Sequence, residues 1–404
     1  MTCLLLVIVY QPIHALGFAS IDDQWMLLDY QLVNPISFNF SHLYSVFTDY
    51  NSLQYAPINT LFYSTVYQIN GFDPFYYHIA NLAIHFINIW MVFKVCCQLL
   101  ERFEISMVKE TSIAISLLWA FHPFNVEAVV WISGSKILLY TLFGLISTQQ
   151  YIFFLDRRKW VNYVISLFFF LISCLSKEQA VILPLVFFAI AVFSGIKLDK
   201  NRFLKYGLNL LPFFLIALIF GLITMDALSS AIGAHTDFSK YPFMERITLS
   251  CYCMGFYIFN TFIPLQLHYH YPFPMKPGER LPTEYYVYAI GIVIFIIVCT
   301  FRFKKNKNYR FYLFCSLFFL INIGLCIQVV PLSRPAMMAD RYMYLPLLGI
   351  LMLMISEGYQ SLILFSENKL KHPVLLPLAI FCLALLLECL YSHYLVTSWS
   401  KFNL

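Results

Sequence analysis

The chain alternates long apolar runs with short polar connections, and this pattern predicts its elements. An apolar run of about 20 residues can cross a bilayer as a helix, because a helix satisfies its own backbone hydrogen bonds there. The first run lacks the basic start and small-residue cleavage site of a secretory signal, so it is kept as a membrane helix. In chain order, the runs predict helices near residues 3–19, 75–100, 108–124, 136–155, 160–175, 178–195, 205–225, 246–266, 285–301, 311–331, 343–365 and 373–397.

Composition agrees with this interpretation. Of the 404 residues, 60% are hydrophobic, 19% aromatic and only 12% charged, which exceeds the apolar share of a soluble domain. The net charge is +5, and Lys and Arg stand in short clusters between apolar runs. No basic stripe suits a nucleic-acid backbone, whereas such clusters suit membrane orientation. We therefore expect an all-α polytopic membrane protein of about 11 to 12 membrane helices, with the lipid bilayer and no nucleic acid as a partner.

The eleven cysteines do not predict a metal site or a disulfide framework. Most of them lie inside apolar runs, and none shows the paired CxxC spacing of a zinc site. We expect them to be small buried hydrophobic residues.

Basic clusters predict the orientation of the helices, because positive loops stay cytoplasmic. The clusters at 157–159, 197–205, 302–310 and 369–371 should be cytoplasmic, which leaves the loops 20–74, 125–135, 176–178 and 332–342 outside. Three apolar runs lie between the second and third clusters, although parity requires an even number of crossings. The run with Pro264 is expected to be a re-entrant or irregular segment, so that 246–266 is not a simple span.

Ionisable residues gather at the outer ends of the predicted helices. Charged groups at membrane depth are costly and usually face a water-filled cavity or a ligand. For any one of them alone, contact with lipid headgroups is the alternative. The residues are Asp22, Asp23, His122, Glu127, Lys136, Lys177, Glu178, Asp340 and Arg341.

Four separated segments carry a resemblance to a known family. They read YQINGFDPFYYHIANLAIH (67–85), FHPFNVEAVVWISGSKILLYTLF (121–143), LSKEQAVILPL (175–185) and ADRYMYLPLLGI (339–350). In this order they resemble the membrane half of the transmembrane and tetratricopeptide-repeat O-mannosyltransferase-like proteins, with a bacterial relative expected. These enzymes belong to the GT-C glycosyltransferase superfamily.

The resemblance implies a GT-C-type membrane domain over residues 1–404, with a catalytic first outer loop at 20–74 that carries short interfacial helices. Tetratricopeptide repeats, expected after residue 404 in relatives, are not present in this chain. The implied activity is an inverting transfer of a sugar, mannose in the family name, to a hydroxyl acceptor such as protein Ser or Thr. The donor would be a polyprenyl- or dolichyl-phosphate sugar, and no divalent metal is predicted.

The implied location is a bacterial inner membrane, or the endoplasmic reticulum membrane in a eukaryote, with the active site on the extracytoplasmic face. Two alternatives stay open, namely a lipid-linked-sugar transporter or flippase and a catalytically inactive scaffold. A transporter should show internal repeats or broken helices in corresponding halves, and no clear internal repeat is present in the sequence.

The resemblance makes Asp22 and Asp23 the acidic motif of the first outer loop. A positioned carboxylate assists loss of the acceptor hydroxyl proton in the transition state. By position in the motif, the resemblance implies Asp22 as the base and Asp23 as an orienting partner. Equal shares of the base role are not expected, because consecutive side chains rarely point the same way. Repulsion between the two acids should raise one pKa. The alternative is a charged cap on an interfacial helix.

Cations should stabilise the negative charge that develops on the leaving phosphate. Arg341 and Lys177 are the first candidates, with Lys136 and Arg334 behind them. Alternatively, Arg341 forms an ion pair with Asp340, and Glu178 neutralises Lys177. Ala56 stands where many relatives carry an arginine, so one cation of the family pattern is missing.

Three further polar residues are candidates for contacts with the donor, namely His78, His122 and Glu127. His78, Asn81 and His85 share one stripe of a predicted helix, which indicates polar packing between helices more than a metal site. A structural pair between His122 and Glu127 is the alternative to a role with the carrier or sugar.

Overall fold

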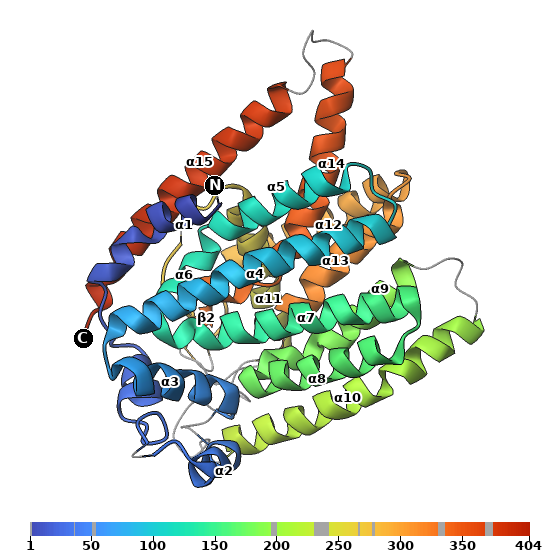
Figure 1. Ribbon diagram of the computed structural model, residues 1–404. Helices are drawn as coiled ribbons and strands as arrows, with labels where there is room; N and C mark the ends of the chain where they lie inside the picture. The colour runs from blue at the N-terminus through green and yellow to red at the C-terminus, as the bar shows by residue number, and fades with distance from the viewer. Residues whose placement is uncertain are drawn as a thin grey trace.

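The computed structural model describes residues 2–35, 37–50, 54–194, 200–229, 242–265, 267–276, 279–329, 336–367 and 375–404. These residues are mostly helical, and the long helices lie side by side (Figure 1). The α-helices are α1 (Thr2–Tyr10), α2 (Phe40–Thr48), α3 (Pro57–Asn70), α4 (Pro74–Arg102), α5 (Val108–Phe121), α6 (Phe124–Val130), α7 (Ser135–Arg157), α8 (Trp160–Ser176), α9 (Leu183–Phe193), α10 (Lys200–Ser229), α11 (Phe243–Phe262), α12 (Thr283–Lys304), α13 (Tyr309–Ile323), α14 (Leu347–Glu367) and α15 (Leu375–Ser398).

Short turns and two strands connect these helices. Strands β1 (Tyr271–Pro272) and β2 (Ala336–Met338) pair antiparallel, with Tyr271 opposite Met338. The short 3₁₀ and π segments are η1 (Gln11–Ala15), η2 (Gln24–Leu28), η3 (Ile132–Gly134), η4 (Glu178–Ile182), η6 (Asp340–Met343) and η7 (Trp399–Phe402).

All twelve predicted apolar runs coincide with helices, which confirms an all-α polytopic membrane protein. Among the described residues, five helices are long and apolar enough to cross a membrane, or six if the bent pair α5 and α6 is one span. Five shorter apolar helices accompany them. Segment 20–74 carries α2 and α3, in agreement with the short helices expected there.

Helix α11 corrects one part of an expectation. The expected irregular backbone in 246–266 is wrong, because Phe243–Phe262 is a continuous helix. Among the described residues, this helix is not one of those long and apolar enough to cross a membrane, which agrees with the prediction that 246–266 is not a simple span. Pro264 follows the helix instead of breaking it. The irregular backbone lies instead between α5 and α6, which meet at an angle of 62° where Pro123 follows His122. Proline disfavours a helical residue before it, and this accounts for the break.

Local sequence fixes where the helices around the first loop begin and end. Asp73 caps α4, its side chain accepting from the Phe75 amide at 3.1 Å, and Pro74 occupies the first helical position. A proline there sacrifices no intrahelical hydrogen bond. Gly71 ends α3 with a φ of 63°, a conformation that favours glycine. These signals set the junction between the first loop and the bundle.

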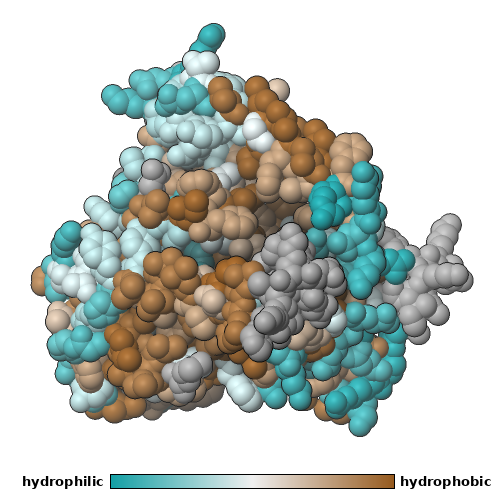
Figure 2. Space-filling model, turned by 90° about the horizontal axis from the view of Figure 1, so that it is seen from above, coloured by the Kyte–Doolittle hydropathy of each residue, from teal (hydrophilic) through white to brown (hydrophobic). Residues whose placement is uncertain are grey.

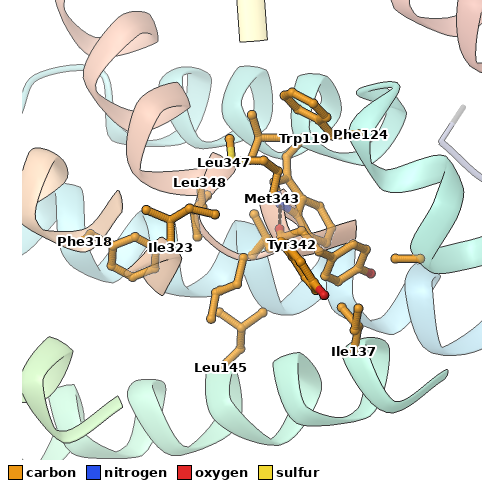
Figure 3. Close-up of a cluster of buried hydrophobic side chains, with 14 of the residues drawn as sticks. Trp119, Phe124, Ile137, Leu145, Phe318, Ile323, Tyr342, Met343, Leu347 and Leu348 are labelled. Atoms are coloured by element: carbon orange, nitrogen blue, oxygen red, sulfur yellow. Dashed lines mark hydrogen bonds between the residues drawn. The ribbon is translucent and has the colours of Figure 1, made fainter. Parts of the chain in front are cut away.

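The core of the bundle surrounds the start of α14. Tyr342 and Met343 of η6 and Leu347 and Leu348 of α14 lie among side chains of α5, α7 and α13 (Figure 3). The Trp119 indole of α5 donates to the carbonyl of Tyr344 at 2.7 Å. This packing holds η6, and therefore Asp340 and Arg341, at a fixed place in the bundle.

The outside of the bundle is apolar. Helices α10, α12 and α15 expose many large hydrophobic side chains, as expected for surfaces that face lipid. Figure 2 shows broad hydrophobic patches on one face, bordered by hydrophilic residues.

Basic residues lie at the end of the bundle opposite the first loop. Arg102 at the end of α4 forms an ion pair with Asp156 at the end of α7. Arg302 at the end of α12 lies 3.6 Å from Glu357 of α14. In Figure 1 the ends of α4 and α7 and the start of α10 lie on the side away from α2 and α3. Lys369 and Lys371 lie outside the described residues.

Candidate active site

The two acids of the first loop have different surroundings. Asp23 is fully buried, and its carboxylate accepts from the Ala19 amide at 2.7 Å, from the Ser133 amide at 3.0 Å and from the Ser133 hydroxyl. Asp22 is partly exposed and accepts from the Trp25 indole at 3.2 Å. The side chains therefore do not share one role: Asp23 is a buried anchor for the loop, whereas Asp22 can meet a substrate.

Burial changes the acidity of Asp23. It raises the pKa of the carboxyl group from 3.8 to about 6, while the hydrogen bonds from Ser133 and Ala19 oppose the rise. The charge of Asp22 adds a smaller rise. Repulsion between the acids was expected to raise one pKa, but desolvation is the larger cause.

A pocket lies beside the acidic motif. Trp25 and Met26 of η2 form one wall of it, and residues at the start of α3, including Ala56 and Asn59, form another. Lys136 of α7 adjoins this pocket, because its ammonium donates to the pocket residue Gln54 at 2.9 Å and lies 3.4 Å from the Met26 sulfur. Ala56, which stands at the position of the family arginine, and the buried Lys136 therefore both lie at this pocket.

Arg341 of η6, which is partly buried, forms a pair with the buried Glu127 of α6. The guanidinium forms an ion pair with the Glu127 carboxylate, which also accepts from the Arg341 amide at 2.7 Å. The guanidinium lies 4.7 Å from the Trp131 ring centroid and 5.1 Å from that of Tyr342, within the range of cation–π attraction. The acid in ion-pair contact with the Arg341 guanidinium comes from α6, and the charge of Arg341 also acts to lower the pKa of the adjacent Asp340.

Asp340 faces the small sheet instead. Its carboxylate accepts from the Tyr271 hydroxyl at 2.7 Å, a contact made possible by the pairing of β1 with β2. Burial raises the pKa of Asp340, and the nearby Glu127 carboxylate raises it further. The same burial and the Asp340 charge raise the pKa of the Tyr271 hydroxyl. The sequence did not indicate Tyr271, since no local pattern links residues this far apart.

Lys177 and Glu178 form a pair at the start of η4. The Lys177 ammonium lies 3.1 Å from a Glu178 carboxylate oxygen, and only 2% of the Lys177 side chain is exposed. This confirms the alternative that Glu178 pairs with Lys177. Burial of a charged ammonium costs desolvation free energy, and a neighbouring carboxylate offsets part of that cost.

The histidines lie in polar contacts between helices. His78 Nε2 is 3.3 Å from the Gly17 carbonyl, and His85 lies between the Tyr344 hydroxyl at 2.7 Å and the Ala120 carbonyl at 3.0 Å. Asn81 donates to carbonyls around η3. The predicted polar packing along this stripe of α4 is confirmed for these contacts.

His122 and Glu127 do not pair with each other. His122 Nε2 lies 3.2 Å from the Thr261 carbonyl of α11, and Nδ1 accepts from the Phe124 amide at 3.2 Å. The alternative of a structural pair with Glu127 is therefore wrong, because Glu127 holds Arg341. In the part of the chain that the structure describes, no group of three His, Cys, Asp or Glu side chains could hold a metal ion.

Comparison with known proteins gives the relationship. Human protein O-mannosyl-transferase TMTC3 is 28% identical over 134 residues, which cover 31% of this chain. Protein O-mannosyl-transferase F38B6.6 of Caenorhabditis elegans is 23% identical over 303 residues, or 74% of this chain. The chain is related to the TMTC protein O-mannosyl-transferases.

The relationship has a limited extent. The matched region makes up 13% of human TMTC3 and 41% of the nematode relative, so the chain matches less than half the length of either. Drosophila melanogaster Tmtc1 is 27% identical over 31% of this chain. No protein-family model matches the chain. The expected resemblance to this family is confirmed, whereas these animal proteins give no support for a bacterial source.

The structure connects several of the predicted site residues of this chain through a series of contacts. Asp23 bonds to Ser133 of η3, and Trp131, beside η3, lies under Arg341, which holds Glu127. Lys136 is the second residue of α7 and lies beside the pocket. Arg334 lies outside the described residues, so the structure gives no position for it. Sequence reasoning missed Ser133, Gln54 and Trp131, because uncharged side chains in connecting segments carry no charge signal.

Proposed function

We propose that this chain is an integral-membrane glycosyltransferase that moves mannose from a polyprenyl-phosphate carrier to a hydroxyl of a protein Ser or Thr. The observation that carries the proposal is the relationship to protein O-mannosyl-transferases, together with a partly exposed Asp22 beside a pocket that a buried lysine adjoins. The activity is carried over from the relatives, since the chain matches less than half of their length.

In the proposed reaction, the acceptor hydroxyl oxygen attacks the anomeric carbon of the sugar. The bond between that carbon and the carrier phosphate breaks, and the phosphate leaves with the electron pair. Asp22 takes the hydroxyl proton as general base. Attack from the face opposite the phosphate inverts the anomeric centre.

Asp23 has a positioning role in this proposal. Its three hydrogen bonds tie the first loop to the backbone before it and to η3. The adjacent Asp22 is thereby held near the pocket wall that Trp25 forms. Such orientation makes a large contribution to rate, because the base must already be aligned when the hydroxyl attacks.

The leaving phosphate requires cations, and the buried Lys136 is a candidate because it adjoins the pocket beside the acidic motif. Arg341, which is held by Glu127 and two aromatic rings, and Lys177, which lies beside Glu178, are candidates for the same phosphate. Asp340 and Glu127 then serve to hold the Arg341 segment, and His78 and His122 to hold the helices. Arg334 stays a candidate for the same phosphate.

The proposed active site faces the extracytoplasmic side of the membrane. The described basic clusters lie at the opposite end of the bundle from the acidic motif, and the positive-inside rule assigns that basic end to the cytoplasm. The membrane would be a bacterial inner membrane or the endoplasmic reticulum membrane.

The proposal is tested with purified chain in nanodiscs and a labelled polyprenyl-phosphate mannose, with and without a Ser/Thr-rich acceptor protein. We expect carrier consumption that depends on the acceptor, and label on the acceptor in a linkage that resists mild acid. Movement of intact carrier across a bilayer without consumption would favour a transporter. Neither consumption nor movement, with binding retained, would favour a scaffold; both results would overturn the proposal.

A further inference from the structure

The C-terminal end of the described chain contacts residues 17–20, directly before the acidic motif. The Ser20 amide donates to the Phe402 carbonyl at 3.0 Å, and the Leu404 amide donates to the Phe18 carbonyl at 2.8 Å. Ala19 and Asn403 form an antiparallel bridge between these bonds. The C-terminal end therefore lies alongside the segment that leads into Asp22 and Asp23, as its position in Figure 1 also indicates.

The Asn403 side chain adds contacts that a backbone alone cannot make. Its Oδ1 accepts from the Gly17 amide at 2.9 Å, and its Nδ2 donates to the Ala15 carbonyl at 3.4 Å. A side-chain amide carries both an acceptor and a donor, whereas a carboxylate offers acceptors alone. Asparagine is thus suited to bind both groups of the 15–17 segment at once.

Aromatic rings fix the other side of this contact. Trp399 stacks on Trp131 with ring centroids 6.4 Å apart, and the Arg341 guanidinium lies 4.7 Å from the Trp131 ring centroid. Phe402 lies against Tyr269, with centroids 4.1 Å apart. Residues 399–404, named the exit segment here, are thereby tied to the region of η3 and η6 as well as to the first loop.

The exit segment reaches Asp23 through one residue. Ala19 pairs with Asn403, and the amide of the same Ala19 donates to Asp23 Oδ2 at 2.7 Å. Ser133 holds the other carboxylate oxygen. Asp23 is therefore held between η3 on one side and a backbone that the exit segment positions on the other.

We infer that the exit segment is a clamp that positions the acidic motif, with Asn403 as its positioning residue. The clamp keeps segment 15–20 in the register that directs the Ala19 amide toward Asp23. The position of Asp22 is set in turn, because Asp22 is adjacent to Asp23. The effect of the clamp on catalysis rests on the proposed function. The contact between the exit segment and residues 15–20 is independent of that function.

The first test locks the clamp covalently. A Cβ placed on Gly17 would lie 3.6 Å from the Asn403 Cβ, and disulfides need a Cβ separation of about 3.5–4.5 Å. Gly17→Cys/Asn403→Cys should form a disulfide on mild oxidation of the full chain in nanodiscs, with the exposed Cys3 and Cys382 replaced by serine. Peptide mass mapping detects the disulfide-linked peptides. Each single cysteine variant serves as a control. A folded double variant that does not form the bond would overturn the clamp.

The second test uses that variant as a switch. In the reduced form both Asn403 amide contacts are missing, so the transfer rate should fall by about 10- to 100-fold, the scale of a misplaced catalytic group. Oxidation should restore most of the rate, and the wild-type chain under the same reductant is the control. Equal rates in the two forms would contradict a positioning role.

Asn403→Ala separates positioning from a loss of folding. We expect kcat to fall while the donor KM stays within about 2-fold of wild type, because the clamp acts on the base and not on donor binding. The melting temperature should change little, since the lost bonds are exposed. A loss explained by unfolding alone would contradict the inference.

One measurement is independent of any transferase activity. Backbone amide hydrogen exchange at Gly17, Ser20 and Leu404 should be faster in Asn403→Ala than in the wild-type chain. Unchanged exchange at these amides would overturn the clamp. Faster exchange in a chain without transfer would leave the clamp standing and remove the proposed function alone.

Discussion

At the scale of single residues, the adjacent acids show how burial separates two identical side chains. Asp23 gives both carboxylate oxygens to donors, and Asp22 stays at the surface beside Trp25. A sequence can place two acids side by side, but it does not show which one the fold will cover. Here the buried acid is Asp23, which is hydrogen-bonded by Ser133, 110 residues away in the sequence.

The buried Asp23 should leave a pH signature on stability. The folded protein keeps the proton up to about pH 6, whereas the carboxyl group ordinarily releases it near 3.8. Its contribution is therefore fully present below about pH 4 and is lost as pH rises through 6, on the order of 3 kcal/mol for this shift. Melting curves between pH 4 and 7 should show wild type losing stability relative to Asp23→Asn. Parallel curves would show that Asp23 titrates normally.

The Arg341 pair should behave as a buried ion pair. Arg341→Ala leaves the Glu127 carboxylate buried without the guanidinium, which should cost about 3–5 kcal/mol of unfolding free energy. The double variant Arg341→Ala/Glu127→Ala should lose less than the sum of the single losses, because it leaves no unpaired charge. Additive losses in thermal unfolding would mean that the two side chains do not interact.

At the scale of elements, close helix packing depends on particular glycines. A Cβ on Gly349 of α14 would lie 2.7 Å from the Cys315 carbonyl oxygen and 2.8 Å from the Phe319 amide nitrogen of α13. These are backbone atoms, which cannot move aside as a side chain can. The close approach of α13 and α14 helps to hold the η6 segment in place (Figure 3).

Gly349→Ala should therefore destabilise the chain by about 1–3 kcal/mol, the usual cost of overpacking. Gly358 is a matched control on the same helix, since a Cβ there meets nothing within 4 Å. Gly358→Ala should be neutral or stabilising by up to about 1 kcal/mol. Thermal unfolding in one detergent measures both, and equal effects of the two substitutions would refute the packing argument.

The apolar pattern was enough to place the helices, but not the contacts between them. Each of the twelve runs coincides with a helix, although only five or six of the described helices are long and apolar enough to cross a membrane. The pair between Glu127 and Arg341 joins residues 214 positions apart, and the bond from Tyr271 to Asp340 depends on two very short strands. No local signal encodes such partners.

At the scale of the whole molecule, the distribution of charge predicts the orientation. Ser20→Cys, beside the acidic motif, should react with an impermeant thiol reagent in intact cells or sealed vesicles. Lys305→Cys, after α12, should react only after permeabilisation. Both positions are exposed, and the exposed Cys3 and Cys382 should first be replaced by serine. The reverse labelling pattern would place the acidic motif on the cytoplasmic face.

The most direct test compares wild type and Asp22→Asn in transfer of labelled mannose from a polyprenyl-phosphate carrier to an acceptor protein. Asparagine keeps the size of the side chain and removes the proton acceptor, so the rate should fall about 10²-fold or more, while donor binding persists. Expression and folding are matched before rates are compared. Equal transfer rates in the two proteins, or no transfer by the wild-type chain with any acceptor, would contradict the account.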